Sequence, residues 1–283
     1  MRSQFAETNG IRLHFVDHGG GGPTLILAPG LTANARFFDA IVADGLGDGV
    51  RVLAVDLRGR GLSDKPESGY TMAEHGRDVV GLIDALGLER VILGGHSFGG
   101  LLTYFVASHH PERVSKCVVL DAPGVVDPML VEQIKPSLAR LESTVPSFDQ
   151  YVDAVRSQPY FDGWWDRRIE IYYRADAEDL PDGSVRPRSS PDHIRQAIDG
   201  TLTVDWPDVV RRVTAPTLLI RATGSFGPQG YPPILPAEVG ARTIEALPDG
   251  RMVEVNGNHI TAFFGTGSAR VAAAIRSFIL EET

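Results

Sequence analysis

The stretch Val91-Ile92-Leu93-Gly94-Gly95-His96-Ser97-Phe98-Gly99-Gly100 decides the fold that we predict for this chain. Its three leading apolar residues predict a buried strand, and the apolar residues 101–107 that follow it predict a helix. Between them lies a Gly-x-Ser-x-Gly motif centred on Ser97. A serine in so sharp a strand-to-helix turn exposes its hydroxyl at a helix N-terminus, where free N–H groups favour negative charge. The context predicts a nucleophile; the alternative is a glycine-rich turn with an ordinary serine.

Short apolar runs and helical patterns alternate on both sides of this motif. Residues 4–6 and 11–16 alternate in polarity around Asn9-Gly10, which predicts an opening β-hairpin. Further buried strands are predicted at residues 24–28, 50–55, 114–120, 217–222 and 252–255. Helices are predicted at residues 37–45, 73–86, 236–247 and 268–280. This order predicts an α/β fold with a mostly parallel sheet and right-handed crossovers.

The pattern changes between residues 124 and 213. Apolar β-branched runs disappear, and residues 130–141, 148–156, 164–173 and 191–202 have helical spacing interrupted by prolines. A segment of this length is too long for a loop inside a compact domain. We therefore expect residues 124–213 to form an inserted helical cap, and residues 1–123 and 214–283 to form the core domain.

Composition limits the possible classes of protein. The chain has 283 residues, of which 43% are hydrophobic, and a net charge of −9. This acidic balance argues against nucleic acid or an anionic membrane as a partner. No apolar stretch is long enough to span a bilayer, and we expect a cytoplasmic protein with a small-molecule substrate. The single cysteine, Cys117, lies in an apolar run and predicts a buried thiol. No metal-ligand cluster or dinucleotide-binding fingerprint appears, so we expect no metal and no cofactor, and we leave the oligomeric state open.

Four motifs together make the chain resemble the α/β-hydrolase fold superfamily over nearly its whole length. They are the turn Pro29-Gly30-Leu31, the loop Asp56-Leu57-Arg58-Gly59-Arg60-Gly61-Leu62-Ser63-Asp64, the motif around Ser97, and Gly257-Asn258-His259. The resemblance implies an eight-stranded, mostly parallel sheet flanked by helices. It also implies a Ser-acid-His triad in that chain order, an oxyanion hole, and a substrate pocket under the cap.

A serine hydroxyl needs a base to act as a nucleophile at neutral pH. His259 is the best candidate, because it follows the last predicted strand in a turn-rich loop, where the catalytic groups of open α/β sheets collect. The alternative is a loop histidine that caps the next helix. His96 directly precedes Ser97, so we expect it to point away from the nucleophile and to be structural. His193 lies in the expected cap, and a surface position is the simpler interpretation.

The triad acid is where the sequence departs from the common family pattern. Many members carry it in the loop after the strand that corresponds to residues 217–222, but here residues 223–230 contain no carboxylate, and Ser225 occupies the usual position. The alternative is Asp121, which ends the strand at residues 114–120 and lies 24 residues after Ser97. Some family branches place their acid there. We therefore assign the acid to Asp121, with Glu238 as the alternative.

An oxyanion hole needs two backbone N–H groups directed at the developing negative charge. Phe98, which follows the nucleophile, supplies one, and the resemblance assigns the other to Leu31. The family often has His-Gly in that turn, whereas this chain has Pro29-Gly30. Because only backbone donors are needed, the change should be tolerated. Asp56, Arg58 and Asp64 match the family's structural loop, and we interpret them as scaffolding.

A serine nucleophile points to an acyl-enzyme, and hence to cleavage of esters, thioesters, lactones or amides. We predict a carboxylic-ester hydrolase with Ser97, Asp121 and His259 as the triad. The aromatic residues expected in the cap favour an apolar substrate, although they could equally be the core of the cap itself; they are Tyr160, Phe161, Trp164, Trp165, Tyr172 and Tyr173. One alternative is a C–C bond hydrolase or perhydrolase of the same fold. Another is a non-catalytic ligand receptor, which the acid-free loop makes possible.

Overall fold

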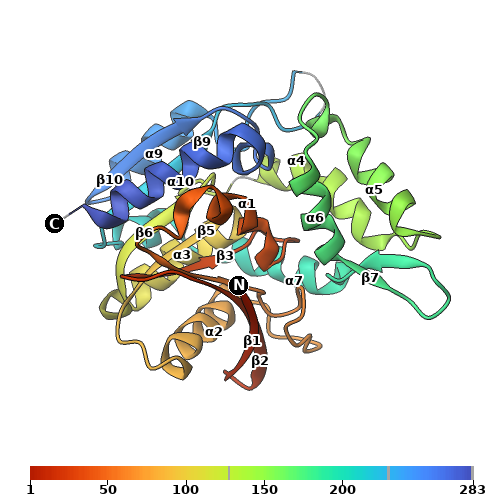
Figure 1. Cartoon of the computed structure of the whole chain (residues 1–283). Coiled ribbons are helices and arrows are strands. Elements are labelled where there is room, and N and C mark those ends of the chain that lie inside the picture. The colour runs from red at the N-terminus through yellow and green to blue at the C-terminus, as the bar shows by residue number, and fades with distance from the viewer. Residues whose placement is uncertain (127, 228–229, 282–283) are drawn as a thin grey trace.

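The computed structural model describes residues 1–126, 128–227 and 230–281. In these ranges, eight strands form one sheet in the order β1-β2-β4-β3-β5-β6-β9-β10 (Figure 1). The strands are β1 (Arg2–Thr8), β2 (Ile11–Gly19), β3 (Thr24–Ala28), β4 (Arg51–Val55), β5 (Val91–His96), β6 (Val114–Leu120), β9 (Thr217–Ala222) and β10 (Gly250–Val255). β2 runs antiparallel to β1 and β4, and every other pair is parallel. The mostly parallel sheet that the sequence predicts is therefore confirmed.

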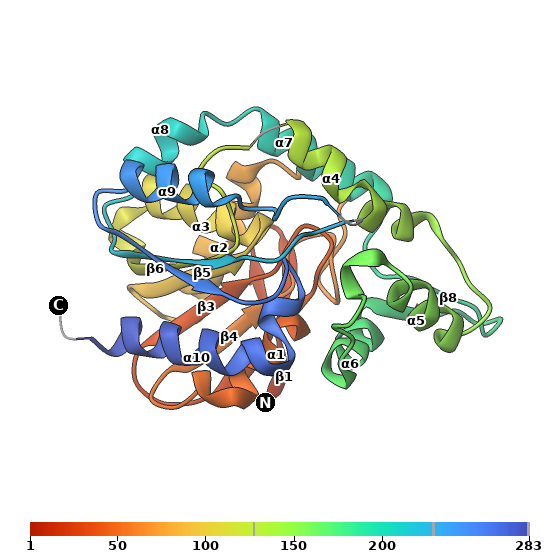
Figure 2. The same cartoon turned by 90° about the horizontal axis from the view of Figure 1, so that it is seen from above.

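Alternation along the central strands divides the core between the two faces of the sheet. Leu25 and Leu27 belong to one apolar cluster, and Ile26 between them belongs to the other. The face that contains Ile26 is covered by α2 (Met72–Ala85), α3 (Phe98–His109), α8 (Trp206–Arg211) and α9 (Ala237–Ala246). The opposite face is covered by α1 (Asp39–Ile41) and α10 (Gly265–Leu280), as Figure 2 shows. Both faces are buried, which explains why these strands read as continuous apolar runs.

Local signals explain most of the element boundaries. Asn9 and Gly10 both have positive φ values, 47° and 75°, which a tight hairpin between β1 and β2 requires. Thr71 and Glu74 form a capping box at the start of α2. The helix predicted at residues 37–45 is instead a 3-10 turn (Ala35–Phe38), the single turn α1 and a wider turn (Val42–Leu46), because Gly45 takes a φ of 104°.

Residues 128–202, which we call the helical insertion, leave the sheet and lie beside it (Figures 1 and 2). They contain α4 (Pro128–Ala139), α5 (Phe148–Arg156), α6 (Arg167–Asp176) and α7 (Pro191–Leu202). Between α6 and α7 lies a hairpin of β7 (Ala177–Asp179) and β8 (Val185–Pro187), which the sequence analysis missed. α8 follows the insertion and packs against α3 and α9 of the core.

Polar contacts fix the helical insertion to the core at several separate points. Arg168 on α6 forms an ion pair with Asp44 at 2.7 Å, and the Gln196 amide on α7 donates to the carbonyl of Glu67 at 3.0 Å. At the edge of the candidate site, Asn258 Nδ2 donates to the carbonyl of Tyr160 at 2.6 Å. These contacts hold the insertion over the carboxyl ends of the parallel strands.

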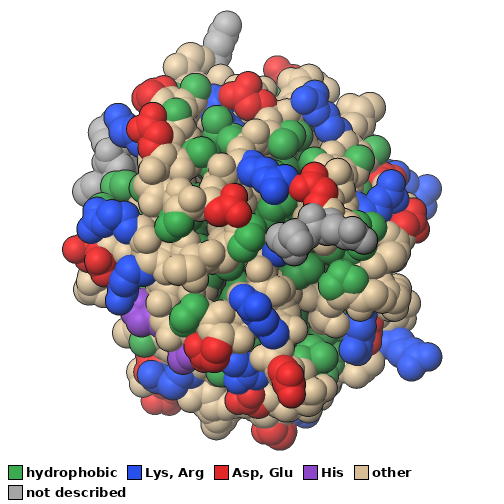
Figure 3. Space-filling model, turned by 90° about the vertical axis from the view of Figure 1, so that its left-hand side faces the viewer, with side chains coloured by type: hydrophobic (Ala, Val, Ile, Leu, Met, Phe, Trp, Pro, Cys, Tyr) green, Lys and Arg blue, Asp and Glu red, His purple; other side chains and the backbone are tan. Residues whose placement is uncertain are grey.

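Cys117 on β6 is fully buried, as the sequence predicts, and burial raises the pKa of its thiol to about 12. On the face shown in Figure 3, side chains of both charge signs are interspersed with hydrophobic ones. None of the described helices has the length and apolar character needed to cross a lipid bilayer.

Candidate active site

Ser97 lies in the turn between β5 and α3 and has φ 53° and ψ −115°. This conformation is rare for a residue with a side chain and typically costs about 1–3 kcal/mol. The surroundings hold it in place: Ser97 N–H donates to the carbonyl of Leu120 at 2.9 Å, and the Ser97 carbonyl accepts from Gly100 and Leu101. Its side chain lines a cavity between the core and the helical insertion. The structure thus places the Ser97 side chain at the N-terminus of α3, as the sequence predicts, and adds that its backbone is strained.

The glycines on both sides of Ser97 are required by close backbone approaches. A Cβ on Gly99 would lie 2.0 Å from the carbonyl oxygen of Ala28 on β3. A Cβ on Gly95 would lie 2.3 Å from the carbonyl carbon of Gly99. Both of these atoms belong to the backbone of tightly packed central elements, so a shift of either would cost considerable free energy.

Gly99→Ala should therefore lower both stability and activity. Overpacking of this kind costs about 1–3 kcal/mol, and relief of the clash would displace α3 and Ser97 with it. Urea unfolding followed by circular dichroism measures the first effect, and ester turnover measures the second. Gly21→Ala is the control, because a Cβ at Gly21 meets nothing within 4 Å. Equal unfolding midpoints for the two variants would contradict this account of the turn.

His259 and Asp121 meet at the carboxyl ends of β10 and β6. Their Nδ1 and Oδ2 atoms are 2.7 Å apart, and Asp121 is fully buried. Because a carboxylate oxygen accepts, Nδ1 carries the proton, and in the neutral imidazole Nε2 is then the acceptor. Asp121 itself has a φ of 49°, and its Oδ1 accepts from the N–H of Ala222 at 2.9 Å. Both carboxylate oxygens are therefore occupied and the side chain is fixed.

The loop that carries His259 is held by its own side chains and by His96. Asn258 Oδ1 accepts from the N–H groups of Ile260 and Thr261, both at 3.0 Å. His96 Nε2 donates to the carbonyl of His259 at 2.7 Å, and the two rings lie 4.4 Å apart. Burial and the neighbouring His259 lower the pKa of His96 well below its usual range, so its ring is neutral. His96 thus has a structural role in holding this loop, but it lines the cavity together with Ser97, whereas the sequence analysis expects it to point away from the nucleophile.

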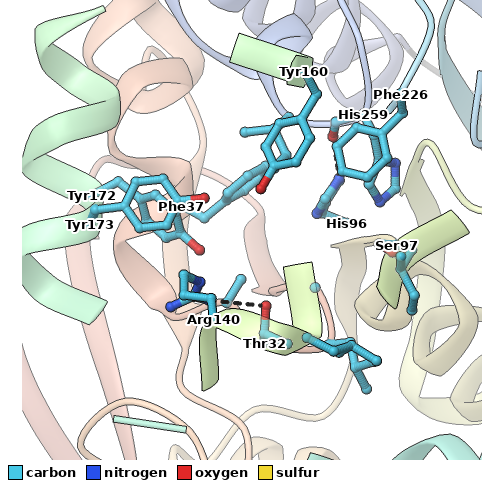
Figure 4. A pocket seen from close by; sticks show the side chains of 16 residues that line it. Thr32, Phe37, His96, Ser97, Arg140, Tyr160, Tyr172, Tyr173, Phe226 and His259 are labelled. Carbon is cyan, nitrogen blue, oxygen red and sulfur yellow. Dashed lines mark hydrogen bonds between the residues drawn. The ribbon is translucent and has the colours of Figure 1, made fainter. Parts of the chain in front are cut away.

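Ser97 and His259 line the same cavity, as Figure 4 shows. No hydrogen bond joins their side chains within the described residues, and such bonds often tighten only when substrate is bound. The other candidate acid, Glu238, is exposed in the first turn of α9. Ser225 is exposed as well, and in the same loop Phe226 packs its ring 5.4 Å from that of His259. The structure brings Asp121 to His259 and leaves Glu238 outside the site.

The two N–H groups expected to form an oxyanion hole lie in the turn after β3 and at the start of α3. Among the described residues, neither the Leu31 nor the Phe98 N–H has a hydrogen-bond partner, and Leu31 lines the cavity. Behind them lies Arg60, which is fully buried. Its Nε donates to the Leu31 carbonyl at 3.0 Å, and its guanidinium carbon lies 5.2 Å from the centre of the Phe98 ring. Arg60 therefore contacts both residues, a role that the sequence analysis did not assign.

The loop around Arg60 is tied together by the residues interpreted as scaffolding. Arg58 forms two bonds of 2.6 Å to Asp78 on α2. Asp56 accepts from the N–H of Ala35 at 2.7 Å and from that of Leu62 at 2.8 Å. These contacts connect the loop to the turn after β3 and to α2, in agreement with a structural role.

The cavity at Ser97 is small: the centre of a water molecule can explore about 70 Å³ of it. Its lining comes from both the core and the helical insertion: Gly30, Leu31, Thr32, Ala33, Phe37, His96, Ser97, Ile134, Leu138, Arg140, Tyr160, Tyr172, Tyr173, Phe226, His259 and Ile260. Of the aromatic residues expected in the cap, the three tyrosines line this cavity. Phe161 and Trp165 pack against each other with ring centres 5.2 Å apart, and Trp164 is exposed.

Arg140, which the sequence analysis did not single out, contributes a cation to this lining. Its Nη1 contacts Asp176 and the Tyr151 hydroxyl, and its Nη2 donates to Thr32 Oγ1 at 3.4 Å. Burial acts to lower the pKa of Arg140, but Asp176 and nearby tyrosines raise it, and the net pKa is well above the usual range. Burial also raises the pKa values of Tyr172 and Tyr173, so both hydroxyls keep their protons. One part of the cavity is therefore polar and includes a permanent cation.

No group of three or more His, Cys, Asp or Glu side chains in the described ranges is arranged to hold a metal ion.

Comparison with known proteins gives one family match and several similar proteins, which cover from less than half to nearly all of the chain. Residues 23–266 match the family model described as alpha/beta hydrolase fold. The 2-(acetamidomethylene)succinate hydrolase of Mesorhizobium japonicum is 31% identical over 242 residues, which cover 84% of this chain and 81% of that protein. The 2-hydroxymuconate semialdehyde hydrolase of Pseudomonas sp. is 38% identical over 128 residues, which cover 42% and 43%. The crystal structure of E-2-(acetamidomethylene)succinate hydrolase superposes with a TM-score of 0.82 at 28% identity, covering 98% of both chains.

Proposed function

The chain belongs to the α/β-hydrolase fold family, and we propose that it is a serine hydrolase that cleaves a small carbonyl substrate through an acyl-enzyme. The observation that carries this proposal is the 2.7 Å contact between His259 Nδ1 and Asp121 Oδ2, because His259 lines the same cavity as Ser97. The contact leaves His259 Nε2 as the acceptor that a serine nucleophile needs. We assign the roles of nucleophile, base and orienting acid to Ser97, His259 and Asp121.

The proposed reaction has two halves. In the first, His259 Nε2 takes the proton of Ser97 Oγ as the oxygen attacks the substrate carbonyl, and the N–H groups of Leu31 and Phe98 stabilise the resulting oxyanion. The intermediate collapses to the acyl-enzyme, and the histidine returns the proton to the leaving group. In the second half, His259 takes a proton from a water molecule as the water attacks the acyl carbonyl, and it then returns this proton to Ser97 Oγ. The acid product leaves and the free serine is restored.

We propose that the helical insertion, which lies within the predicted segment 124–213, acts as a cap. Support comes from the cavity lining, because Ile134, Leu138, Arg140, Tyr160, Tyr172 and Tyr173 all belong to the insertion. A cap of this kind excludes water and bulky substrates from the serine. Both relatives' names denote small organic acids, which supports a small-molecule substrate.

An ester bond is our first proposal, and a carbon–carbon bond is the second. A hydroxymuconate semialdehyde has no ester or amide bond, so the name of that relative implies cleavage between carbon atoms. The name of the other relative contains an acetamido group, which is an amide. Cleavage of an ester, an amide or a carbon–carbon bond can proceed through the same acyl-enzyme, and ester hydrolysis tests that route directly. A receptor of this fold would instead bind its ligand without releasing a product.

A series of p-nitrophenyl esters from acetate to octanoate should reveal hydrolysis, with the short acyl chains preferred. The small cavity is the physical reason, since a long chain would need the cap to open. Release of p-nitrophenolate gives kcat/KM for each ester, and mass spectrometry of a rapidly quenched reaction should detect the acyl group on Ser97. Saturable ligand binding without product release from esters, amides or diketones would contradict the proposed function and support the receptor instead.

A further inference from the structure

We propose that Arg140 and Thr32 form a subsite that binds a carboxylate of the substrate. The subsite lies across the cavity from Ser97 and His259, as Figure 4 shows. This inference rests on the proposed function, because it assigns the substrate class of the same cavity. The predicted substrate has a carboxylate a few bonds away from the carbonyl that reacts, as in a half-ester or half-amide of a short dicarboxylic acid.

The first argument is the set of donors that the Arg140 guanidinium leaves unused. Nη1 is occupied by Asp176 and Tyr151, and Nη2 makes one long contact of 3.4 Å to Thr32. Within the described residues, Nε–H has no hydrogen-bond partner, and the long contact to Thr32 uses at most one of the two Nη2 N–H groups. Nε–H and one Nη2 N–H share an edge of the planar guanidinium, and that fork matches the two oxygens of a carboxylate. An arginine that served only to bind Asp176 would not need to border the cavity, yet Arg140 lines it with donors to spare.

The second argument is the way Arg140 is held. Asp176 is buried, with 1% exposure, and it accepts from both Arg140 and the Tyr151 hydroxyl. The guanidinium carbon also lies 5.5 Å from the centre of the Tyr173 ring. These contacts fix the guanidinium before any ligand arrives, so a bound carboxylate would not have to order a flexible side chain. Asp176 balances the charge of Arg140, and recognition therefore depends on the geometry of the free edge.

The third argument is the position of the subsite relative to the reacting atoms. Thr32 follows Leu31, the proposed oxyanion donor, and its hydroxyl can donate to an anion that displaces the long Arg140 contact. Tyr172 and Tyr173, whose hydroxyls keep their protons, line the same cavity. A carboxylate here would meet only donors from these residues. A hydrocarbon group would instead leave the Arg140 donors buried and unpaired, which is costly.

The test compares two esters of equal size, mono-p-nitrophenyl succinate and p-nitrophenyl 4-methylpentanoate. They differ in whether the acyl chain ends in a carboxylate or in an isopropyl group. We expect the wild type to prefer the succinate by kcat/KM after subtraction of the spontaneous rate. Arg140→Met should reduce this preference by at least about tenfold, the lower end of what a hydrogen bond to a charged group contributes. Arg140→Lys should give an intermediate preference, because it keeps the charge and loses the fork.

Arg186→Met is the matched control, since Arg186 lies on the hairpin of the insertion and forms an exposed ion pair with Glu178. It removes the same charge outside the cavity and should leave the preference unchanged. Circular dichroism establishes that each variant is folded. If Arg140→Met does not fold, Thr32→Val tests the subsite through its other residue. This variant should also reduce the preference for the succinate ester. An unchanged preference in folded Arg140→Met would overturn the inference.

Binding of succinate to Ser97→Ala separates this inference from the proposed function. Isothermal titration calorimetry should detect binding that weakens at least about tenfold in the Ser97→Ala, Arg140→Met double variant. If the wild type hydrolyses no ester but succinate binding depends on Arg140, the proposed function fails and the subsite stands. If esters are hydrolysed but Arg140→Met changes neither the preference for the succinate ester nor the binding of succinate, the inferred subsite is wrong and the proposed function stands.

Discussion

Ser97→Ala should reduce kcat for ester hydrolysis by at least about 10⁴-fold, because the substitution removes the atom that forms the acyl-enzyme. Substrate should still bind, since the cavity walls and the N–H groups of Leu31 and Phe98 are unchanged. The expected signature is therefore a loss of kcat without a matching rise in the dissociation constant. Steady-state p-nitrophenolate release measures the first quantity, and calorimetry with a non-hydrolysed acid product measures the second.

Ser225→Ala is the matched control for this experiment, since Ser225 is an exposed serine in the loop after β9. It should hydrolyse esters as the wild type does. If Ser97→Ala instead retained wild-type kcat and still accumulated a covalent acyl group, the nucleophile would be another residue. If it retained turnover without a covalent intermediate, the reaction would proceed by direct attack of water.

The parallel core could be predicted because its signals are local. Continuous apolar runs mark strands that are buried on both faces. The predicted first and last residues of β3, β6 and β9 are those that the structure shows. The assignment of the acid to Asp121 rather than Glu238 rested on the position of Asp121 at the end of a predicted strand and on family branches that carry their acid there; in the structure β6 and β9 are neighbours, so their carboxyl ends share one edge of the sheet. The 2.7 Å contact agrees with that reasoning.

The residues that shape the cavity could not be predicted, because their positions depend on how the helical insertion packs. Arg140 follows α4 in a short 3-10 turn, and it resembles any surface arginine until Asp176, thirty-six residues later, is placed beside it. Phe226 lies in the loop after β9, which has no carboxylate, and nothing in the sequence indicates that its ring packs against His259. The hairpin of β7 and β8 has strands of only three residues each, too short for a periodic pattern, although Asp182-Gly183 was a usable turn signal.

Asp121→Asn should reduce kcat/KM by orders of magnitude, about 10⁴-fold where an orienting aspartate is replaced without a change in geometry. The reason lies in the two bonds that the carboxylate accepts, from Ala222 N–H at 2.9 Å and from His259 Nδ1–H at 2.7 Å. An asparagine has one acceptor oxygen and one donor NH₂. If the oxygen keeps the bond to the fixed Ala222 N–H, the NH₂ must face His259, and Nδ1 must then become the acceptor. The proton moves to Nε2, where it blocks the acceptance of a proton from Ser97.

Glu238→Gln provides the comparison, because it makes the same carboxylate-to-amide change at the exposed acid on α9. It should hydrolyse the preferred ester at the wild-type rate. A large loss in Glu238→Gln with near-normal activity in Asp121→Asn would reverse our assignment of the acid. The imidazole proton resonances of His259 offer a check that does not depend on turnover: a downfield Nδ1 proton should be present in the wild type and absent in Asp121→Asn. Loss of that resonance together with activity would identify the tautomer, rather than a general loss of structure, as the cause, because Asp121 acts on the reaction only through the ring that it orients.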